Sequence, residues 1–319
     1  MSKPSVHIVV RSAGERTKDL CVRLAEVQLP HGSGLTVISE VPFEKALRSC
    51  YEAGLKAGCK WTMTLDADVM LRPGAVQILL EEAERMPPHY LQLEGYIFDK
   101  VMGIYRVAGN RIYRTEFLPI AFQQIPETGT QIRPERFALR KLSAVGYPSR
   151  RIPQVVGVHD FEQYYRDLYI KSFTHGRKHI EYGGQIIKNC SGNQNIDPDY
   201  RVMLKGFCDG LLTSANVMCD RRLFNDEANS AIQSLGLQEK AQIQDLEDKI
   251  SNMPAFFESL FVRHPIPQID MQDEPAVIKV RTDNWIAKVK KRIKRHGFLR
   301  GIIASAGALL KFAGQWLDR

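Results

Sequence analysis

Cysteine is scarce in this sequence. The chain has six cysteines in 319 residues, and no two of them form a CxxC pair. Cys21 and Cys50 fall on the apolar faces of helices that the residue spacing predicts. We therefore expect all six to be reduced and mostly to act as small buried hydrophobic residues in a cytoplasmic protein. They are Cys21, Cys50, Cys59, Cys190, Cys208 and Cys219.

A charged-then-apolar signal segment is also missing. The opening "MSKPSVHIVV" leads almost directly into a strand-like run, so we do not expect secretion. A long apolar run is missing as well. The apolar stretch at residues 301–317 has 17 residues, contains Lys311 and is rich in glycine and alanine. That length is borderline short for a membrane span.

Outside the tail, the sequence has no excess of either charge. The formal net charge is +8, but residues 281–319 alone hold ten Lys/Arg and two Asp. The preceding 280 residues hold 34 basic and 34 acidic side chains, which argues against a nucleic-acid partner.

The tail is instead typical of a basic amphipathic helix that lies on an anionic membrane surface, with Trp285 and Trp316 as interfacial anchors. A helix packed on its own domain or on a partner subunit is the alternative. The first interpretation predicts a cytoplasmic protein held peripherally on the inner face of a membrane.

The first 86 residues alternate between two periodicities. Strand-like runs at residues 5–10, 35–40 and 61–68 alternate with helical spacing at residues 15–28, 42–58 and from Pro73 onward. Gly58 suits the end of the second helix. This order predicts an α/β fold with a mostly parallel sheet flanked by helices and joined by right-handed crossovers.

Carboxylates stand where the third strand ends, in "WTMTLDADVMLRPGAV". Ligands of open parallel sheets bind beyond the carboxyl ends of the strands, and Arg11, Glu40 and the pair Asp66 and Asp68 all lie at such ends. Two neighbouring aspartates repel each other unless a cation lies between them. Mg²⁺ or Mn²⁺ would supply that charge and would stabilise a leaving diphosphate. In the alternative, the aspartates only start a loop and cap a helix.

Beyond residue 89 the pattern changes. The stretch "GIYRVAGNRIYRTEF" resembles a hairpin with its turn near residues 108–110, and a strand ending near Val158 is followed by a helix after His159. We expect a catalytic domain at residues 1–225, a helical segment and linker at 226–280, and the membrane-associating helix as a C-terminal extension at 281–319.

The order strand, helix, strand, helix, strand and DxD resembles the GT-A fold of nucleotide-sugar-dependent glycosyltransferases, family 2-like. The resemblance covers roughly residues 5–180 and is good over the first 86. It implies that Asp68 ligates the metal and that Asp66 contacts the ribose or shares the metal. A later histidine commonly completes such a site, and His159 in "GVHDFEQYY" matches it, with His175 and His179 as competitors.

The same resemblance assigns the nucleotide of the donor. Arg11 and Glu40 match positions that commonly meet the base and the ribose. Lys45 and Arg48 fall on the helix where such enzymes often contact the base or the phosphates. The implied donor is a nucleoside-diphosphate sugar.

The general base is less defined by the sequence. An inverting transferase needs a carboxylate near the acceptor hydroxyl, and Asp160 and Glu162 are placed to serve, with Asp209 a distant third. A retaining mechanism stays open. Four residues of the predicted hairpin could line the acceptor side, where the cations among them would suit a diphosphate-lipid acceptor, or they could form a solvated face. These hairpin residues are Tyr105, Arg106, Arg111 and Arg114.

We therefore expect a metal-dependent glycosyltransferase whose acceptor is a membrane-linked glycan or lipid precursor, as in lipopolysaccharide, O-antigen or capsule assembly. Three alternatives remain: a sugar nucleotidyltransferase, a haloacid-dehalogenase-type phosphatase, and a non-enzymatic scaffold docked on a membrane. The first would show a Gly-rich loop after the first strand. The second would carry its aspartates on that first strand and a threonine in the motif.

Overall fold

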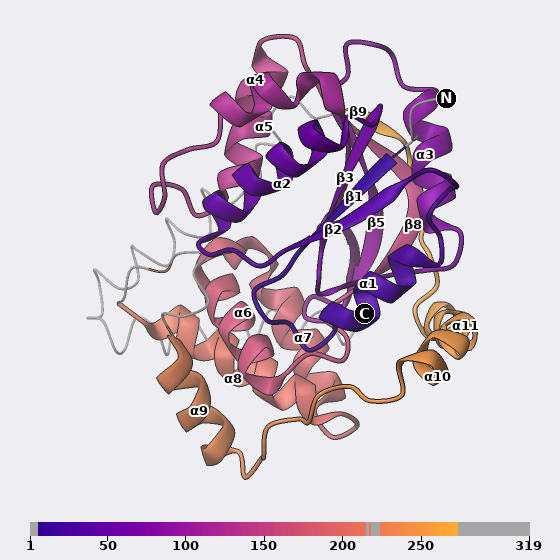
Figure 1. The fold of residues 1–319 in the computed structure, drawn as a ribbon. Helices are drawn as coiled ribbons and strands as arrows, with labels where there is room; N and C mark the ends of the chain where they lie inside the picture. Colours follow the sequence, from indigo (N-terminus) through magenta and orange to yellow (C-terminus); the bar gives the residue numbers. More distant parts are fainter. Residues whose placement is uncertain (1–5, 215–216, 218–223, 274–319) are drawn as a thin grey trace.

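A computed structural model describes residues 6–214, 217 and 224–273 of the chain (Figure 1). Its first 86 residues form the alternating strands and helices that the sequence predicts, with one addition. A short strand, β4, directly follows the two aspartates, and α3 begins at Ala75 rather than at Pro73. The elements are β1 (Val6–Arg11), α1 (Lys18–Glu26), β2 (Gly34–Ile38), α2 (Phe43–Ala57), β3 (Trp61–Asp66), β4 (Val69–Leu71) and α3 (Ala75–Glu84).

The second part of the chain adds more strands and then helices. The strands are β5 (Gln92–Asp99), β6 (Ile104–Val107), β7 (Asn110–Arg114), β8 (Ser149–His159) and β9 (Gln272–Asp273). The α-helices are α4 (Leu118–Gln123), α5 (Pro134–Ala144), α6 (Tyr165–Lys178), α7 (Gly183–Asn193), α8 (Pro198–Leu212), α9 (Asn225–Ser234), α10 (Leu246–Ser251) and α11 (Met253–Arg263). Two 3₁₀ turns are present: η1 (Thr115–Phe117) connects β7 to α4, and η2 (Ile180–Tyr182) connects α6 to α7.

The central sheet has the order β2-β1-β3-β7-β5-β8-β4. The pairs β2–β1, β1–β3 and β5–β8 are parallel, whereas β7 runs antiparallel to both β3 and β5, and β4 runs antiparallel to β8. Consequently β2, β1, β3, β5 and β8 point in one direction, and β7 and β4 run against them. The prediction of an α/β fold with a mostly parallel sheet flanked by helices is confirmed.

The predicted hairpin is wrong in its pairing. Both strands exist, but β6 and β7 each pair with β5, and β7 also pairs with β3. The alternation of apolar and polar residues indicates which face of the sheet a residue occupies. It does not indicate which strand lies beside it, so the sequence alone could not give this pairing.

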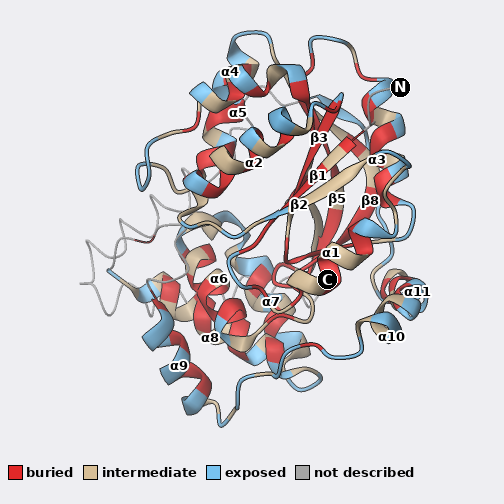
Figure 2. Ribbon diagram, viewed as in Figure 1, coloured by how far each residue is buried: buried red, intermediate tan, exposed pale blue. Residues whose placement is uncertain are grey.

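Helices cover both faces of the sheet, and strand residues alternate between them. Ile8 and Val10 pack with α1 and α3 on one face, whereas Val9 packs with α2, α4 and α5 on the other. Figure 2 shows the resulting buried central strands between half-exposed helices. A third apolar cluster joins α6, α7, α8 and α9.

Helices α6 and α8 approach each other very closely because glycines face the contact. A Cβ added at Gly210 would lie 2.0 Å from the carbonyl oxygen of Phe173, and one added at Gly206 would lie 2.4 Å from that of Tyr169. Gly176 on α6 faces the backbone of Gly210 in the same way. This contact fixes the position of α6, which carries several side chains of the site described below.

The described residues after α8 include the helices α9, α10 and α11. In the region where the sequence suggests a linker, Gln272–Asp273 pairs with β8. Among the described residues, none of the helices combines the length and apolar character that crossing a membrane requires. The predicted basic helix at residues 281–319 lies outside the described residues, and the division into domains stays a prediction.

Candidate active site

Four strands that run in the same direction end in polar residues at one edge of the sheet. Arg11 ends β1, Asp66 ends β3, Asp99 ends β5 and His159 ends β8. The β1–β3 register pairs Arg11 with Asp66, and the β5–β8 register pairs Asp99 with His159. The parallel arrangement therefore brings these side chains together.

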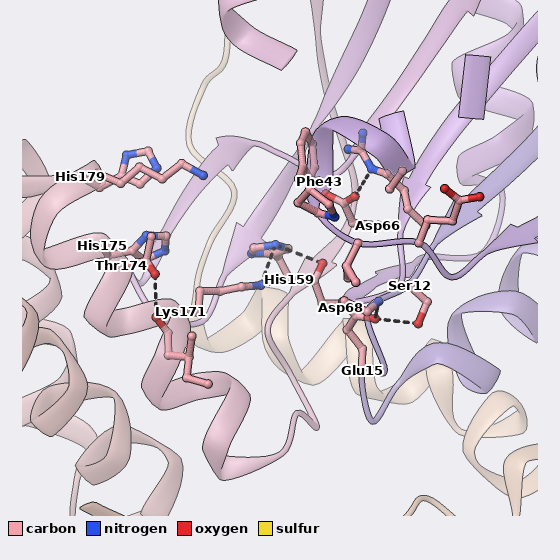
Figure 3. Close-up of a pocket in the computed structure, with 18 of the residues that line it drawn as sticks. Ser12, Glu15, Phe43, Asp66, Asp68, His159, Lys171, Thr174, His175 and His179 are labelled. Atoms are coloured by element: carbon pink, nitrogen blue, oxygen red, sulfur yellow. Dashed lines mark hydrogen bonds and ion pairs between the residues drawn. The ribbon is translucent and has the colours of Figure 1, made fainter. Parts of the chain in front are cut away.

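A cavity of about 230 Å³ opens at this edge. Its strand-end side is lined by Arg11, Glu40, Asp66, Asp68 and His159, and its other side by residues of α6. The convergence of the strand-end residues that the sequence predicts is present in the structure. Figure 3 shows Lys171, Thr174 and His175 on α6, and His179 just after it, facing the strand ends across the cavity.

Asp66 pairs with a cation of the protein itself. Its Oδ1 accepts a hydrogen bond from Arg11 Nε at 2.5 Å, and the same guanidinium donates to Glu135 at 3.2 and 3.4 Å. Burial alone would lower the pKa of Arg11, but Asp66 and Glu135 raise it well above its ordinary value. Arg11 also lies over the ring of Phe43, 4.7 Å from its centroid. These contacts hold the charged side chains of Arg11, Asp66 and Glu135 in place at the β1 side of the cavity.

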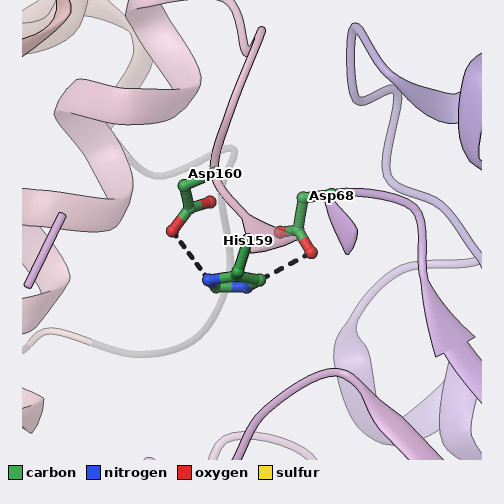
Figure 4. A group of neighbouring side chains, drawn as sticks. All are labelled: Asp68, His159 and Asp160. Atoms are coloured by element: carbon green, nitrogen blue, oxygen red, sulfur yellow. Dashed lines mark ion pairs between the residues drawn. The ribbon is translucent and has the colours of Figure 1, made fainter. Parts of the chain in front are cut away.

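Asp68 belongs to a different group, which it forms with His159 and Asp160 (Figure 4). Each of the three offers a possible metal-ligand atom, and these atoms lie within 4.8 Å of one another. His159 Nε2 is 3.3 Å from Asp68 Oδ1, and His159 Nδ1 is 2.9 Å from Asp160 Oδ2. Two carboxylates and an imidazole form a donor set that suits Mn²⁺ or Mg²⁺.

The unexpected strand β4 accounts for this arrangement. It pairs with β8 so that Val69 lies opposite His159, which places Asp68 beside the end of β8. The backbone N–H of Asp160 donates to the carbonyl oxygen of Asp68 at 3.1 Å. Asp160 itself has a φ of 66°, a left-handed conformation that costs free energy in a residue other than glycine and that is found preferentially at functional sites.

Lys171 of α6 reaches into this group. Its ammonium contacts Asp68 Oδ2 and Asp160 Oδ1 and lies 3.4 Å from His159 Nε2. At neutral pH the group therefore holds positive charge supplied by the chain, from the Lys171 ammonium and from protonated His159. This observation shows that the position suits positive charge, and it supports the fit of the three side chains to a divalent metal.

His159 is also contacted by a third carboxylate, that of Asp99. Asp99 Oδ2 lies 3.0 Å from His159 Nδ1 and accepts a hydrogen bond from Arg106 Nε at 2.7 Å. Burial lowers the pKa of His159, but Asp160 and Asp68 outweigh burial and raise it to about 10. Burial raises the pKa of Asp99, but Arg106 and His159 hold it well below its ordinary value. Such carboxylate–histidine contacts orient metal-binding imidazoles.

His175 lies on the α6 side of the cavity and is 4% exposed. Neither of its ring nitrogens has a hydrogen-bond partner among the residues that the structure describes. Burial and the neighbouring His179 lower the pKa of His175 well below its ordinary value, so the ring is neutral. A neutral imidazole offers one donor and one acceptor to whatever enters the cavity. The structure does not bring His175 or His179 into the Asp68 group.

Three predicted site residues lie away from the cavity. Lys45 is 64% exposed and pairs with Glu40 at 3.3 Å. Arg48 donates to the carbonyl oxygen of Ile125 at 3.0 Å. Glu162 pairs with Arg16 at 2.8 Å. None of them lines the cavity described above.

A second cavity, of about 190 Å³, adjoins the first, and the two share Arg11, Asp66, Arg106 and Lys178. Arginines dominate its further lining. They are Arg111, Arg133 and Arg136.

The structure brings Arg106 and Arg111 of the predicted acceptor residues to this cavity. Tyr105 instead donates to the carbonyl oxygen of His264 at 2.5 Å, and Arg114 lies over the ring of Trp61. Asp209 accepts a hydrogen bond from Tyr169 at 2.8 Å and is not part of either cavity lining.

Sequence reasoning missed Asp99, Glu135 and Lys171. Asp99 had a detectable signal, since it is a carboxylate at the end of a strand in "YIFD". Lys171 had a weaker signal, because Lys171, His175 and Lys178 recur at the spacing of one helical face. Glu135 had none, because it reaches the site from the first turn of α5, which no motif connects to β1.

Comparisons with known proteins give only distant likenesses. No protein-family model matches the chain, and a search of curated proteins finds no match.

A search of solved structures does find matches. A mannosyltransferase from Pyrobaculum calidifontis, solved with GDP-Man and Mn²⁺, is 12% identical, with 83% of each chain covered and a TM-score of 0.40. A glycosyltransferase involved in glycosylation of the major capsid of PBCV-1 is 17% identical over 49% of this chain and 82% of its own, with a TM-score of 0.33. A197 from STIV is 14% identical over 50% of this chain and 84% of its own, with a TM-score of 0.33. Because these TM-scores lie below 0.5, we base the function on the residues of the cavity.

Proposed function

We propose that the chain is a metal-dependent glycosyltransferase that moves a sugar from a nucleoside-diphosphate sugar to an acceptor. One observation carries the proposal. A cation-binding group of Asp68, His159 and Asp160 adjoins a cavity at the carboxyl ends of the parallel strands, and cations of α6 face it. That combination suits a diphosphate held beside a metal.

Mn²⁺ or Mg²⁺ bound by Asp68, His159 and Asp160 would neutralise negative charge that develops on the departing nucleoside diphosphate. The residues of the chain do the rest. Arg11, Asp66 and Glu40 line the part of the cavity that we assign to the base and the ribose. Lys178 and Lys171 of α6 supply positive charge for the phosphates.

We assign Asp160 to cation binding rather than to the role of general base. Its side chain is 1% exposed, and both of its carboxylate oxygens meet cationic or imidazole partners. A general base must come within hydrogen-bond reach of the acceptor hydroxyl. Glu162 faces Arg16 and Lys249 instead of the cavity.

We further propose that the acceptor carries an anionic group. The second cavity is lined by six cationic side chains and by only two carboxylates, Asp66 and Glu135. Burial together with Arg140 and Arg133 lowers the pKa of Arg136, which reflects an excess of positive charge around it. Arginine guanidinium groups bind phosphates through paired hydrogen bonds. A phosphate or diphosphate of a lipid-linked or other glycan precursor fits this chemistry.

The membrane location rests on the sequence of residues 281–319 alone. We propose that this basic amphipathic tail holds the enzyme on the anionic inner face of a membrane, where a lipid-linked acceptor would lie. Deleting residues 281–319 should release the protein from anionic liposomes and leave transfer to a soluble acceptor intact. Continued liposome binding would contradict the assignment.

The experiment for the main proposal is thermal unfolding with UDP or GDP, each with and without Mn²⁺. We expect stabilisation by nucleotide only when the metal is present, followed by release of the sugar from a matching donor in a screen of nucleotide sugars. Equal stabilisation with and without metal would contradict the proposal. Release of pyrophosphate from a nucleoside triphosphate mixed with a sugar phosphate would instead indicate a nucleotidyltransferase, and phosphate release from sugar phosphates would indicate a phosphatase.

A further inference from the structure

We propose that Lys171 is the resident cation of the Asp68–His159–Asp160 group, and that a divalent metal must displace its ammonium in order to bind. Lys171 then makes metal binding depend on the donor diphosphate. The inference rests on the proposed function for the identity of the metal and the donor, but it concerns a residue that neither the family resemblance nor the comparisons assign.

The contacts place the ammonium where a metal would have to lie. Lys171 Nζ contacts one oxygen of Asp68 and one of Asp160, and it lies 3.4 Å from His159 Nε2. The possible ligand atoms of these residues lie within 4.8 Å of one another. Since Mg²⁺ binds its ligands at about 2.0–2.1 Å, a metal that used all three would occupy the space among them. The ammonium and the metal cannot share it.

The charges of the site also indicate that the Lys171 ammonium and a divalent metal do not bind there together. Asp68 and Asp160 are 5% and 0% exposed, so their charges must be balanced within the protein. In the structure the ammonium of Lys171 contributes to that balance. A divalent ion brings enough charge for both carboxylates, and the ammonium would then be repelled at short range in a poorly solvated site.

The displaced ammonium of Lys171 can move into the first cavity. Lys171 lines the first cavity beside Thr174, His175 and Lys178 on the same face of α6. The close contact of α6 with α8 at Gly206 and Gly210 holds the helix in position, so only the flexible side chain has to move. A diphosphate in the cavity would accept the displaced ammonium, and without one the ammonium returns to the carboxylates.

Two consequences follow for binding. Metal alone binds weakly, because only the fraction of molecules in which Lys171 has left the group is competent. Nucleoside diphosphate raises the metal affinity, because it stabilises the displaced lysine, and by linkage the metal raises the nucleotide affinity by the same factor.

The experiment measures Mn²⁺ binding to the full chain by the electron paramagnetic resonance signal of free Mn²⁺, with and without UDP or GDP. Without nucleotide, we expect Lys171→Met to bind Mn²⁺ at least about 10-fold more tightly than the unsubstituted protein. The nucleotide should enhance Mn²⁺ binding less in the variant. Lys178→Met removes the same charge from the same helix outside the Asp68 group, and its Mn²⁺ affinity without nucleotide should stay within about 2-fold.

A second measurement needs no variant. Brief acetylation of the unsubstituted protein, followed by mass spectrometry of the peptide that contains Lys171, reports how accessible the ammonium is. Mn²⁺ without nucleotide should raise the labelling of Lys171 and leave that of Lys45, which is already exposed, unchanged.

The outcomes separate this inference from the proposed function. Unchanged or weaker Mn²⁺ binding by Lys171→Met, or labelling that Mn²⁺ does not raise, would overturn the inference even if sugar transfer is found. Tighter binding by the variant together with no transfer from any donor would support the inference and would count against the proposed function.

Discussion

Asp66 and Asp68 stand two residues apart in the chain, yet they face different cations. Asp66 Oδ1 lies 2.5 Å from Nε of Arg11, its register partner on the adjacent parallel strand. Asp68 instead meets Lys171 and His159. The repulsion between the two carboxylates is therefore relieved by two separate positive groups, and the two side chains can have separate roles.

This separation predicts different effects of two matched substitutions. Asp68→Asn should weaken Mn²⁺ binding at least about 10-fold and abolish transfer, since it removes a charged ligand. Asp66→Asn should leave Mn²⁺ affinity within about 3-fold and raise the KM for the donor, since it loosens Arg11 instead. Titration of Mn²⁺ and steady-state kinetics of both variants check this. A loss of Mn²⁺ binding of similar size in both would show that the aspartates share the metal.

Glu135 makes stability depend on pH at the acid end. Burial raises its pKa, but Arg11 and Arg111 outweigh burial and lower the pKa from 4.5 to about 2. A carboxyl with a lowered pKa in the folded state contributes its stabilisation above pH 4.5 and loses it as the pH falls toward 2.

The loss from Glu135 is on the order of 3 kcal/mol. In urea unfolding at pH 6 and pH 3, the drop in the free energy of unfolding should be smaller for Glu135→Gln than for the unsubstituted protein. Equal drops would contradict the role of Glu135. The variant should also be less stable at pH 6, because Arg11 and Arg111 lose a buried partner.

The glycine contact between α6 and α8 predicts that a substitution outside the cavity lowers stability and weakens donor binding. In Gly210→Ala, the added Cβ would meet the backbone of Phe173 at 2.0 Å, so one helix has to shift. We expect a loss of about 1–3 kcal/mol in the free energy of unfolding and a raised KM for the donor, because Lys171 moves with α6.

The matched control for this substitution is Gly192→Ala on α7. Nothing lies within 4 Å of a Cβ added there, so this variant should be neutral or more stable by up to about 1 kcal/mol. Denaturant titration of the two variants side by side gives the comparison. If both variants are equally stable, the helix contact is looser than the structure indicates.

The second cavity predicts that an anion binds there and stabilises the protein. Two arginines of α5 should contribute differently to that binding. Arg136 lines the cavity, whereas Arg140, one turn further along α5, does not. With saturating nucleotide and Mn²⁺ present, inorganic phosphate should stabilise the protein against heat. Arg136→Gln should weaken that phosphate binding by about 5- to 10-fold, and Arg140→Gln by less than about 2-fold. Equal effects would indicate general electrostatic attraction rather than a defined site.

The part of the fold that the sequence predicts is the part with local patterns, namely residue periodicity and residues typical of helix and strand ends. The strands and helices up to α3 were predictable because each shows a clear periodicity and its own boundary residue, such as Gly58 at the end of α2. The placement of Arg11, Glu40, Asp66 and Asp68 around one cavity followed from strand direction, whereas His159 came from the family resemblance and its place at the end of a strand.

The rest depended on contacts between distant segments. Strand β4 has three residues, too few for a period, and its pairing with β8 is what moves Asp160 beside Asp68. The partners Glu135 and Lys171 come from helices whose packing no local pattern encodes. The family resemblance gave Asp66 contact with the ribose or a share of the metal, and the structure pairs its side chain with Arg11.

The pairing of β4 with β8 has a consequence for how the protein is made. The cation group joins residue 68 to residues 159, 160 and 171, so it cannot assemble until the chain as far as α6 has left the ribosome. A nascent chain that ends near residue 150 would already contain Arg11, Glu40 and Asp66 but would have no place to hold a metal. Any fragment of that length should therefore lack this group and should show no Mn²⁺ binding there.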